Sequence, residues 1–418
     1  MVNLAIDGKR MLDRLSKLGD LGRDADGQLT RLAGTDADKL GRDCLVQWCR
    51  AAGLDVQIDR VGNIIAIWQT DENSGMAPIM LGSHIDTVIG AGKLDGCYGV
   101  IAGLEVIETL KQAGVSTGRP LAVCAFTNEE GVRFAPDMMG SLVYAGGLAV
   151  DDALDSVGID GPTLMSELER IGYLGAREPG FLRPFAYLEL HIEQGPILEA
   201  EGIAIGAVSD VQGICWKRLT ICGQANHAGT TPMSLRRDPG IGAARIISYL
   251  HERASAIDSG FVVTVGSVRF EPDAINVIPS SAVLTVDLRS PDEDVLKRED
   301  GALEIFAREM AAESHLGVEL LTLVRTTPVA FDEGLVDLVE RTAKARGLSC
   351  RRIVSGAGHD AQTMAVIAPS AMIFVPSIGG ISHNALEFTP DDSLVAGANV
   401  LLDSVLNLDH SACRDQPG

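Results

Sequence analysis

Five short motifs in this sequence carry histidines and carboxylates, side chains that bind divalent metal ions in many enzymes. In chain order the motifs are "GSHID", "KLDG", "TNEEG", "LELHIEQG" and "GGISHN". They contribute His84, Asp86, Asp95, Glu129, Glu130, His191 and His383. Imidazole and carboxylate groups are borderline to hard ligands, which suits zinc, manganese or cobalt. A single histidine at a strand end is usually a hydrogen-bonded structural residue, so a metal site requires that these motifs meet in space.

The adjacent residues Glu129 and Glu130 raise a question of charge. Two ionised carboxylates this close repel each other unless a cation or a proton compensates one of them. A solvated surface turn is the ordinary explanation. Neighbouring side chains on an extended chain face opposite ways, so the alternative is that one carboxylate binds a cation while the other stays available for proton transfer.

Four of these motifs are predicted to follow buried β-strands. The apolar runs that precede or contain them are residues 77–84, 120–127, 185–192 and 371–377. Helical patterns, such as residues 99–114, separate the runs. This alternation is typical of an α/β fold with a mainly parallel central sheet covered by helices. The carboxyl ends of parallel strands share one edge of the sheet, so the motifs are predicted to converge where open α/β folds bind ligands.

Five candidate ligands are too many for one tetrahedral ion that keeps an open position for water. They are His84, Asp95, Glu130, His191 and His383. If Asp95 bridges two ions, each ion receives three protein ligands. Two ions about 3.5–4 Å apart produce a hydroxide nucleophile at neutral pH and polarise a carbonyl group. Asp86, two residues after His84, is then predicted to orient an imidazole ring from outside the ligand set.

Residues 211–328 differ in pattern from the rest of the chain. Strand and helix patterns follow there in the order βαββαβ, which is typical of a small ferredoxin-like α+β domain. A length of 418 residues also favours two domains over one. We therefore predict a catalytic metal-binding domain built from residues 1–210 and 329–418, with residues 211–328 inserted in it.

Composition narrows the classes of partner. The chain has 57 acidic and 35 basic residues and a net charge of −22, which disfavours nucleic acids and anionic membranes as partners. Its apolar runs are shorter than a membrane span, and its N-terminus lacks the apolar core of a signal peptide. The eight cysteines form no C-x-x-C pair. We predict a cytoplasmic protein that acts on a small molecule.

The metal-site motifs and several further segments carry a resemblance to a known family. The further segments are "NHAGTTPMSLRRDP", "NVIPSSAVLTVDLRS" and "GAGHDA". Together, in this order and spacing, the motifs resemble the hydantoinase/carbamoylase-type amidases of the binuclear metal aminoacylase and carboxypeptidase superfamily. The resemblance extends from the first helix pattern to the last and implies a zinc-peptidase-like catalytic domain. Related peptidases usually have a carboxylate at the position of His191, so the histidine favours the amidase branch.

The resemblance implies a role for each residue of the metal site. His84, Asp95 and His191 would bind one ion, and Asp95, Glu130 and His383 the other. The ions would be zinc, manganese, cobalt or nickel. Glu129 would be the general base that takes a proton from the bridging water and delivers it to the leaving nitrogen.

The resemblance also implies which residues bind the substrate. Arg289 would bind a substrate carboxylate, although an exposed surface arginine is the ordinary interpretation of an isolated Arg. Asn276 would hydrogen-bond the substrate amide, and His227 would stabilise the oxyanion of the tetrahedral intermediate. Gln194 and Gly358 would line the substrate pocket. His227 reaches the active site of a neighbouring subunit in relatives, so the inserted domain would serve as a lid and hold a homodimer together.

The expected reaction is hydrolysis of the carbamoyl group of an N-carbamoyl-L-amino acid, which gives the L-amino acid, ammonia and carbon dioxide. Two other members of the family, allantoate amidohydrolase and β-ureidopropionase, share these motifs, so their ureido substrates remain open. A non-catalytic ureide-binding protein is the alternative from another class. Cys97 stands after "LDG", where the family usually has an aliphatic residue. We expect it to pack as a small apolar group, with oxidation as a possible liability.

Overall fold

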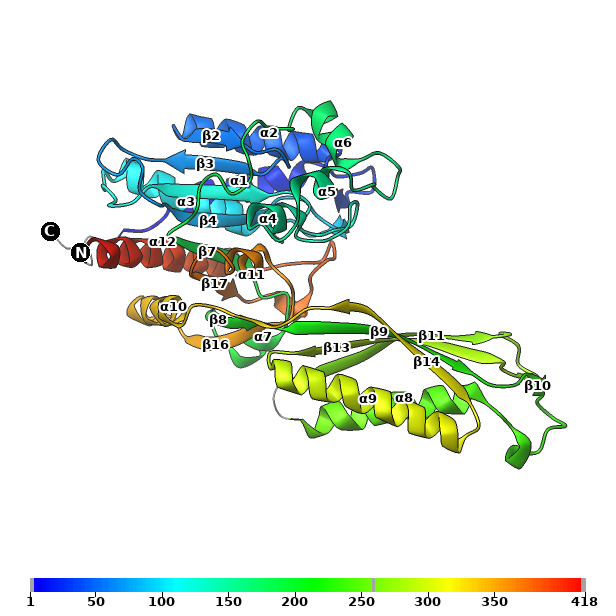
Figure 1. Cartoon of the computed structure of the whole chain (residues 1–418). Helices are drawn as coiled ribbons and strands as arrows, with labels where there is room; N and C mark the ends of the chain where they lie inside the picture. The colour runs from blue at the N-terminus through cyan, green and yellow to red at the C-terminus, as the bar shows by residue number, and fades with distance from the viewer. Residues whose placement is uncertain (1–3, 258–259, 415–418) are drawn as a thin grey trace. The chain divides into compact units, whose positions relative to one another are not determined.

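The computed structural model describes residues 4–257 and 260–414. Two compact units make up the chain: Met1–Ser209 with Phe331–Gly418 form one, and Asp210–Ala330 form the other. The boundaries lie within two residues of the predicted positions 211 and 328. Figure 1 shows the two units, which are described separately below.

The larger unit is built on a mixed sheet with a parallel centre. The sheet has the strand order β8-β17-β7-β4-β6-β3-β2, and β16 also pairs with β8. The strands are β2 (Asp55–Ile58), β3 (Ile64–Trp68), β4 (Ile79–His84), β6 (Leu121–Phe126), β7 (Ala186–Ile192), β8 (Ile205–Val211), β16 (Cys350–Ser355) and β17 (Ser370–Val375). Figure 1 shows that strands from both ends of the chain lie in this sheet. The predicted α/β class is therefore confirmed.

The four central strands, β17, β7, β4 and β6, pair in parallel. Every residue of these strands is buried, as expected for strands covered on both faces. The outer pairs β3–β6, β2–β3 and β8–β17 are antiparallel. Only five residues separate β2 from β3, and a connection this short permits only an antiparallel pair.

Helices cover the central strands. α3 (Cys97–Gln112) packs on β4, β6 and β7, and it is buried along almost its whole length. α12 (Asp391–Arg414) packs on α3 and β17, and α10 (Glu333–Ala345) packs on α12. The other helices of this unit are α1 (Gly8–Asp20), α2 (Asp36–Ala51), α4 (Met139–Tyr144), α5 (Val150–Leu154), α6 (Leu164–Ile171), α7 (Ile197–Glu201) and α11 (Asp360–Met364). Two short strands, β1 (Leu29–Thr30) and β5 (Ile89–Ala91), form a separate pair, and η2 (Ile378–Gly380) is a single 3₁₀ turn.

The smaller unit has the predicted βαββαβ order. Its long elements are β9 (Gly213–Cys222), α8 (Pro239–Ala256), β11 (Val262–Glu271), β13 (Ser281–Ser290), α9 (Glu293–Glu313) and β14 (Gly317–Arg325). The four strands form an antiparallel sheet in the order β11-β13-β9-β14. The short strands β10 (Asn226–His227) and β12 (Val277–Ile278) form a separate pair, and η1 (Met233–Leu235) lies between β10 and α8. β15 (Val329–Ala330) pairs with the last two residues of β8.

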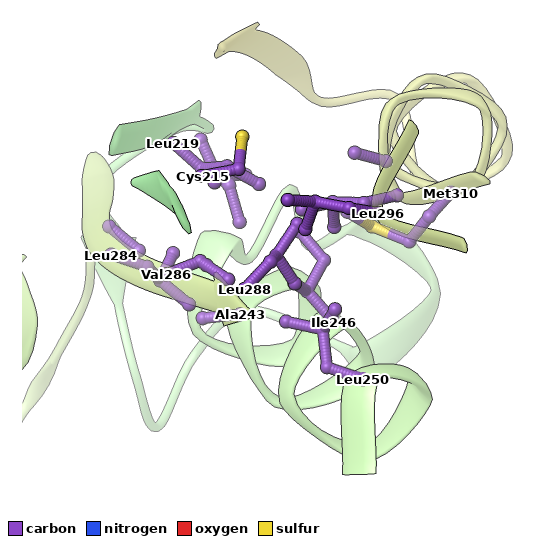
Figure 2. Close-up of a cluster of buried hydrophobic side chains, with 14 of the residues drawn as sticks. Cys215, Leu219, Ala243, Ile246, Leu250, Leu284, Val286, Leu288, Leu296 and Met310 are labelled. Atoms are coloured by element: carbon purple, nitrogen blue, oxygen red, sulfur yellow. The ribbon is translucent and has the colours of Figure 1, made fainter. Parts of the chain in front are cut away.

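One face of this smaller sheet packs against two helices and forms an apolar core with them, which Figure 2 shows in close-up. Leucine, valine and cysteine side chains of β9 and β13 pack there against α8 and α9. Labelled members are Cys215, Leu219, Ala243, Ile246, Leu250, Leu284, Val286, Leu288, Leu296 and Met310. Burial along β13 alternates strictly, so Leu284, Val286 and Leu288 face the core while Asp287 and Arg289 belong to the other face.

Among the helices of residues 4–257 and 260–414, none is both long enough and apolar enough to cross a bilayer.

Candidate metal centre

The predicted ligands meet at the carboxyl edge of the central parallel strands. His84 is the last residue of β4, and His191 is the last but one of β7. Glu129 and Glu130 follow β6 by three and four residues, and His383 follows β17 after η2. Parallel register places His84 beside Phe126 at the end of β6. The strand ends therefore bring these motifs together, as their positions in the sequence predicted.

Asp95 lies at the middle of the cluster, with a different set of imidazoles at each oxygen. Its Oδ1 lies 3.5 Å from His84 Nε2 and 3.2 Å from His191 Nε2. Its Oδ2 lies 3.3 Å from His383 Nε2. Candidate ligand atoms of His84, Asp95 and His191 all lie within 4.8 Å of one another, as do those of Asp95, Glu130 and His383. Asp95 is common to these two triplets.

The electrostatics of the cluster suit cations. Burial favours the neutral form of the Asp95 carboxyl, but the imidazoles of His191, His383 and His84 hold the pKa of Asp95 well below its usual value. Glu130 Oε2 lies 3.4 Å from His383 Nε2, whereas Glu130 Oε1 is buried without a hydrogen-bond partner among the described residues. Burial, with the nearby Asp95, raises the pKa of Glu130 to about 7. A divalent cation would satisfy that oxygen and replace the protons that the cluster otherwise binds.

Glu129 lies beside this cluster in a buried position. Its Oε2 is 3.4 Å from His84 Nε2, and burial raises its pKa well above the usual value of a glutamate, with Glu130 contributing in the same direction. Ligand atoms of His84, Glu129 and Glu130 also lie within 4.8 Å of one another. The two glutamates are thus not a solvated surface turn: both face the same group of imidazoles.

Asp86 contacts the His84 ring through its main chain. His84 Nδ1 lies 3.0 Å from the backbone oxygen of Asp86 and 3.8 Å from its carboxylate, so the main-chain carbonyl is the group that orients the ring. The Asp86 carboxylate instead accepts hydrogen bonds from the backbone N–H groups of Glu129, at 3.2 Å, and Glu130, at 3.3 Å. It therefore fixes the turn that carries both glutamates.

Two predicted substrate residues belong to the same unit as this cluster. Gln194 donates a hydrogen bond from Nε2 to Asp95 Oδ2 at 2.8 Å, so it contacts the carboxylate that the two triplets share. Gln194 and His383 both have a positive φ, of 58° and 52°. A positive φ is uncommon for residues other than glycine, and such residues cluster at functional sites. Gly358 precedes the buried His359, and a Cβ at Gly358 would lie 3.2 Å from Met138 Cε.

The other three predicted substrate residues belong to the smaller unit. His227 is exposed on β10, and its Nδ1 accepts a hydrogen bond from the Gly229 N–H at 3.0 Å. Asn276 is exposed next to β12, the partner of β10, and its carbonyl accepts a hydrogen bond from the Ala228 N–H at 3.0 Å. Arg289 is half-buried on β13 and forms an ion pair with Asp287. Pairing of β10 with β12 brings His227 and Asn276 into one small substructure.

Two residues that sequence reasoning missed support the cluster. Glu387 is buried, and its Oε1 accepts hydrogen bonds from the backbone N–H groups of Leu94, at 2.9 Å, and Asp95, at 3.3 Å. Its other oxygen accepts a hydrogen bond from Ser382 Oγ at 3.1 Å. A glutamate four residues after His383 in "SHNALEF" was the available signal. His359 is also buried, and its ring lies 4.6 Å, centroid to centroid, from that of His191.

Cys97 packs as the sequence predicted. Its side chain is fully buried at the start of α3, and Arg31 Nη2 lies 3.1 Å from its sulfur. Burial raises the pKa of the Cys97 thiol. A buried thiol of raised pKa forms little thiolate, which disfavours its oxidation.

Comparisons with known proteins agree with this site. The peptidase family M20/M25/M40 matches residues 80–407. The N-carbamoyl-L-amino-acid amidohydrolase of Rhizobium meliloti is 39% identical over 97% of this chain and 97% of its own length. The allantoate amidohydrolase of Bacillus subtilis is 33% identical over 95% of this chain and 96% of its own length. A crystal structure of a hydantoinase/carbamoylase family amidase from Burkholderia multivorans is 42% identical, with a TM-score of 0.94, and covers 97% of this chain and 98% of that chain.

The matched region includes all the residues of the cluster and the whole of the smaller unit. The Rhizobium meliloti relative is named an N-carbamoyl-L-amino-acid amidohydrolase, and the Burkholderia multivorans structure is named an amidase of the hydantoinase/carbamoylase family. The chain therefore belongs to peptidase family M20/M25/M40 and is an amidohydrolase of the hydantoinase/carbamoylase type.

Proposed function

We propose that this protein hydrolyses the carbamoyl C–N bond of N-carbamoyl-L-amino acids. One water is consumed, and the L-amino acid, ammonia and carbon dioxide are released. The observation that carries the proposal is Asp95, whose two oxygens face two separate sets of histidines at one sheet edge, with Glu129 beside them. That arrangement suits a pair of divalent ions next to a proton-transfer group.

The proposed ligand sets follow the two triplets that share Asp95. His84 and His191 would complete one set, and Glu130 and His383 the other. Zinc, manganese, cobalt and nickel all suit this mixture of imidazole and carboxylate donors. When bound, such ions lower the pKa of water and polarise a carbonyl oxygen.

Glu129 is proposed to move the proton. It takes a proton from the attacking water and delivers it to the nitrogen of the bond that breaks. Its buried position suits this task, because a carboxylate that is removed from water is a stronger base than a solvated one. The Asp86 carboxylate accepts a hydrogen bond from the Glu129 backbone N–H, which fixes the main chain of Glu129.

Residues of the smaller unit are proposed to bind the substrate. Arg289 would bind the carboxylate with its two-pronged donor geometry, and Asn276 the amide. His227 would stabilise the oxyanion in the active site of a second copy of the chain, which makes a homodimer the working form. Gln194 and Gly358 would line the pocket near the metal ions.

Allantoate and 3-ureidopropionate are the alternative substrates. The stronger similarity to the Rhizobium meliloti relative than to the Bacillus subtilis relative favours a carbamoyl amino acid over allantoate. Each alternative contains both a ureido group and a carboxylate, so the same residues would serve.

A panel of substrates, combined with metal removal, tests the proposal. The protein is dialysed against a chelator, reconstituted with manganese, cobalt, nickel or zinc, and assayed for ammonia release from N-carbamoyl-L-amino acids, allantoate and 3-ureidopropionate. We expect activity to disappear on chelation, to return with metal and to be highest on a carbamoyl amino acid. Highest activity on allantoate would replace the proposed substrate, and no turnover with any metal would favour a ureide-binding protein.

A further inference from the structure

Arg289, the proposed carboxylate-binding residue, is paired with an acid of its own strand. Arg289 Nε lies 3.1 Å from Asp287 Oδ1 and 3.0 Å from Asp287 Oδ2, and Arg289 Nη2 lies 2.8 Å from the same Oδ2. The Asp287 carboxylate thus occupies the edge of the guanidinium formed by Nε and Nη2. This is one of the edges by which an arginine binds a carboxylate with two hydrogen bonds.

The pair is built into the strand register. Asp287 and Arg289 are two residues apart on β13, so they lie on the same face of the sheet, away from the apolar core. Asp287 is flanked by Trp216 on β9 and Thr264 on β11, which carry no charge. In the part of the chain that the structure describes, Arg289 is the one cation that forms an ion pair with Asp287.

The pair is also accessible to a competing anion. The side chains of Arg289 and Asp287 are 27% and 29% exposed. An ion pair this exposed stabilises the folded chain only weakly, so a ligand carboxylate can replace Asp287 at the guanidinium. While that ligand is bound, the two carboxylates repel each other across a few ångströms.

We infer that Asp287 is a displaceable internal counter-ion, which limits how tightly Arg289 holds a carboxylate ligand. The inference rests on the proposed function, because it takes the ligand to be a carbamoyl amino acid. Hydrolysis of the carbamoyl C–N bond leaves the carboxylate on the product. Asp287 therefore competes with substrate and product alike, and its return to Arg289 assists release of the amino acid.

Neutralising Asp287 tests the inference. In Asp287→Asn, the KM for an N-carbamoyl-L-amino acid and the inhibition constant of the product amino acid should both fall by about two- to fivefold, the range for a partly exposed charge pair. The same compound with its carboxylate converted to a carboxamide should show an unchanged KM. A merely structural role of Asp287 would change all three constants or none of them.

Three further variants serve as controls. Asp287→Glu keeps the counter-ion and should resemble the wild type. Glu319→Gln removes one negative charge from an exposed position of β14, and it should leave all three constants unchanged. Arg289→Ala should raise the KM of the carboxylate substrate and the inhibition constant of the product, and it should leave the KM of the carboxamide unchanged. Asp287→Ser provides a second neutral variant if the asparagine variant folds poorly.

The outcomes separate the inference from the proposed function. If Arg289→Ala raises KM but the neutral Asp287 variants leave it unchanged or raise it, the counter-ion role is overturned and the carboxylate-binding role stands. If Arg289→Ala leaves KM unchanged, both roles are overturned. If the KM of the substrate and the inhibition constant of the product both fall in the neutral variants, the inference is supported.

Discussion

Glu129 and Glu130 lie in the same group of imidazoles, but each is paired with a different histidine. Glu129 faces His84, and Glu130 faces His383, each at 3.4 Å. Glu130 forms a triplet of candidate ligands with Asp95 and His383, whereas Glu129 belongs to neither of the triplets that meet at Asp95. Replacing each glutamate should therefore cause a different defect.

In Glu129→Gln, we expect both metal ions to remain and turnover to fall by about 10²–10⁴-fold, the usual contribution of a general base. In Glu130→Ala, we expect loss of metal from one of the two positions. Metal content by elemental analysis and ammonia release distinguish the two defects. Near-normal activity in Glu129→Gln would remove Glu129 from the role of base.

Gly96 follows Asp95 in a space that admits no side chain. It has φ of 61°, and a Cβ there would lie 2.4 Å from His84 Nε2. We expect Gly96→Ala to displace the His84 ring and to lower metal content.

Gly114→Ala is the matched control for this change. Gly114 has a similar φ of 65° but no atom within 4 Å of the added Cβ. Both variants place a side chain at positive φ, but Gly96 has ψ of −49° and so lies outside the left-handed helical region. We therefore expect a larger loss of thermal stability in Gly96→Ala than in Gly114→Ala. Equal metal content in the two variants would contradict the steric explanation.

At the scale of elements, the loop after β17 positions the ligand that precedes α3. The Glu387 carboxylate accepts hydrogen bonds from the backbone N–H groups of Leu94 and Asp95. It also accepts one from the hydroxyl of Ser382, the residue before His383. Two loops that are far apart in the chain are thereby fixed to each other at the site.

We expect Glu387→Ala to weaken metal binding by about 10- to 100-fold, as is usual when a group that orients ligands is removed. Titration of the metal-free protein with zinc in competition with a fluorescent chelator measures this. Glu199→Ala is the control, because Glu199 accepts a hydrogen bond from the Gly379 N–H in η2 but does not contact Asp95. An equal effect of both variants would mean that general loosening of the loop is the cause.

The central strands could be predicted from sequence because each is a continuous apolar run that ends in a polar motif. The antiparallel orientation of β3 and β8 at the sides of the sheet could not be predicted in this way. Both strands are also apolar, and burial alone does not determine whether a strand runs parallel or antiparallel to its neighbour. Residue spacing indicated that Asp86 lies near His84, but it does not distinguish a carboxylate from a backbone carbonyl. Likewise, no pattern in "AVLTVDLRS" shows that Asp287 binds Arg289.

At the scale of the whole molecule, His227 and Glu129 belong to different compact units. The proposed homodimer makes His227 of one copy complete the active site of the other copy. Both residues are therefore necessary, but they need not come from the same chain.

Mixing two inactive variants tests this dimer. Glu129→Gln and His227→Ala are each expected to lose most activity as pure proteins. After dissociation and random reassembly, activity should return to about a quarter of the wild type, because half of the dimers are mixed and each has one intact site. Size-exclusion chromatography with light scattering checks that dimers form. No recovery in mixed dimers would place His227 in its own chain's site.

The first and last residues of the smaller unit lie side by side on paired strands. Asp210 pairs with Ala330, and Val211 with Val329. In the larger unit, the Phe331 N–H donates a hydrogen bond to the Ser209 carbonyl at 2.9 Å. A short turn could therefore close the larger unit at this place without altering the strands that carry the metal ligands. In evolutionary terms, this junction is a permissive insertion point, at which a whole module can be gained, lost or exchanged in one genetic event.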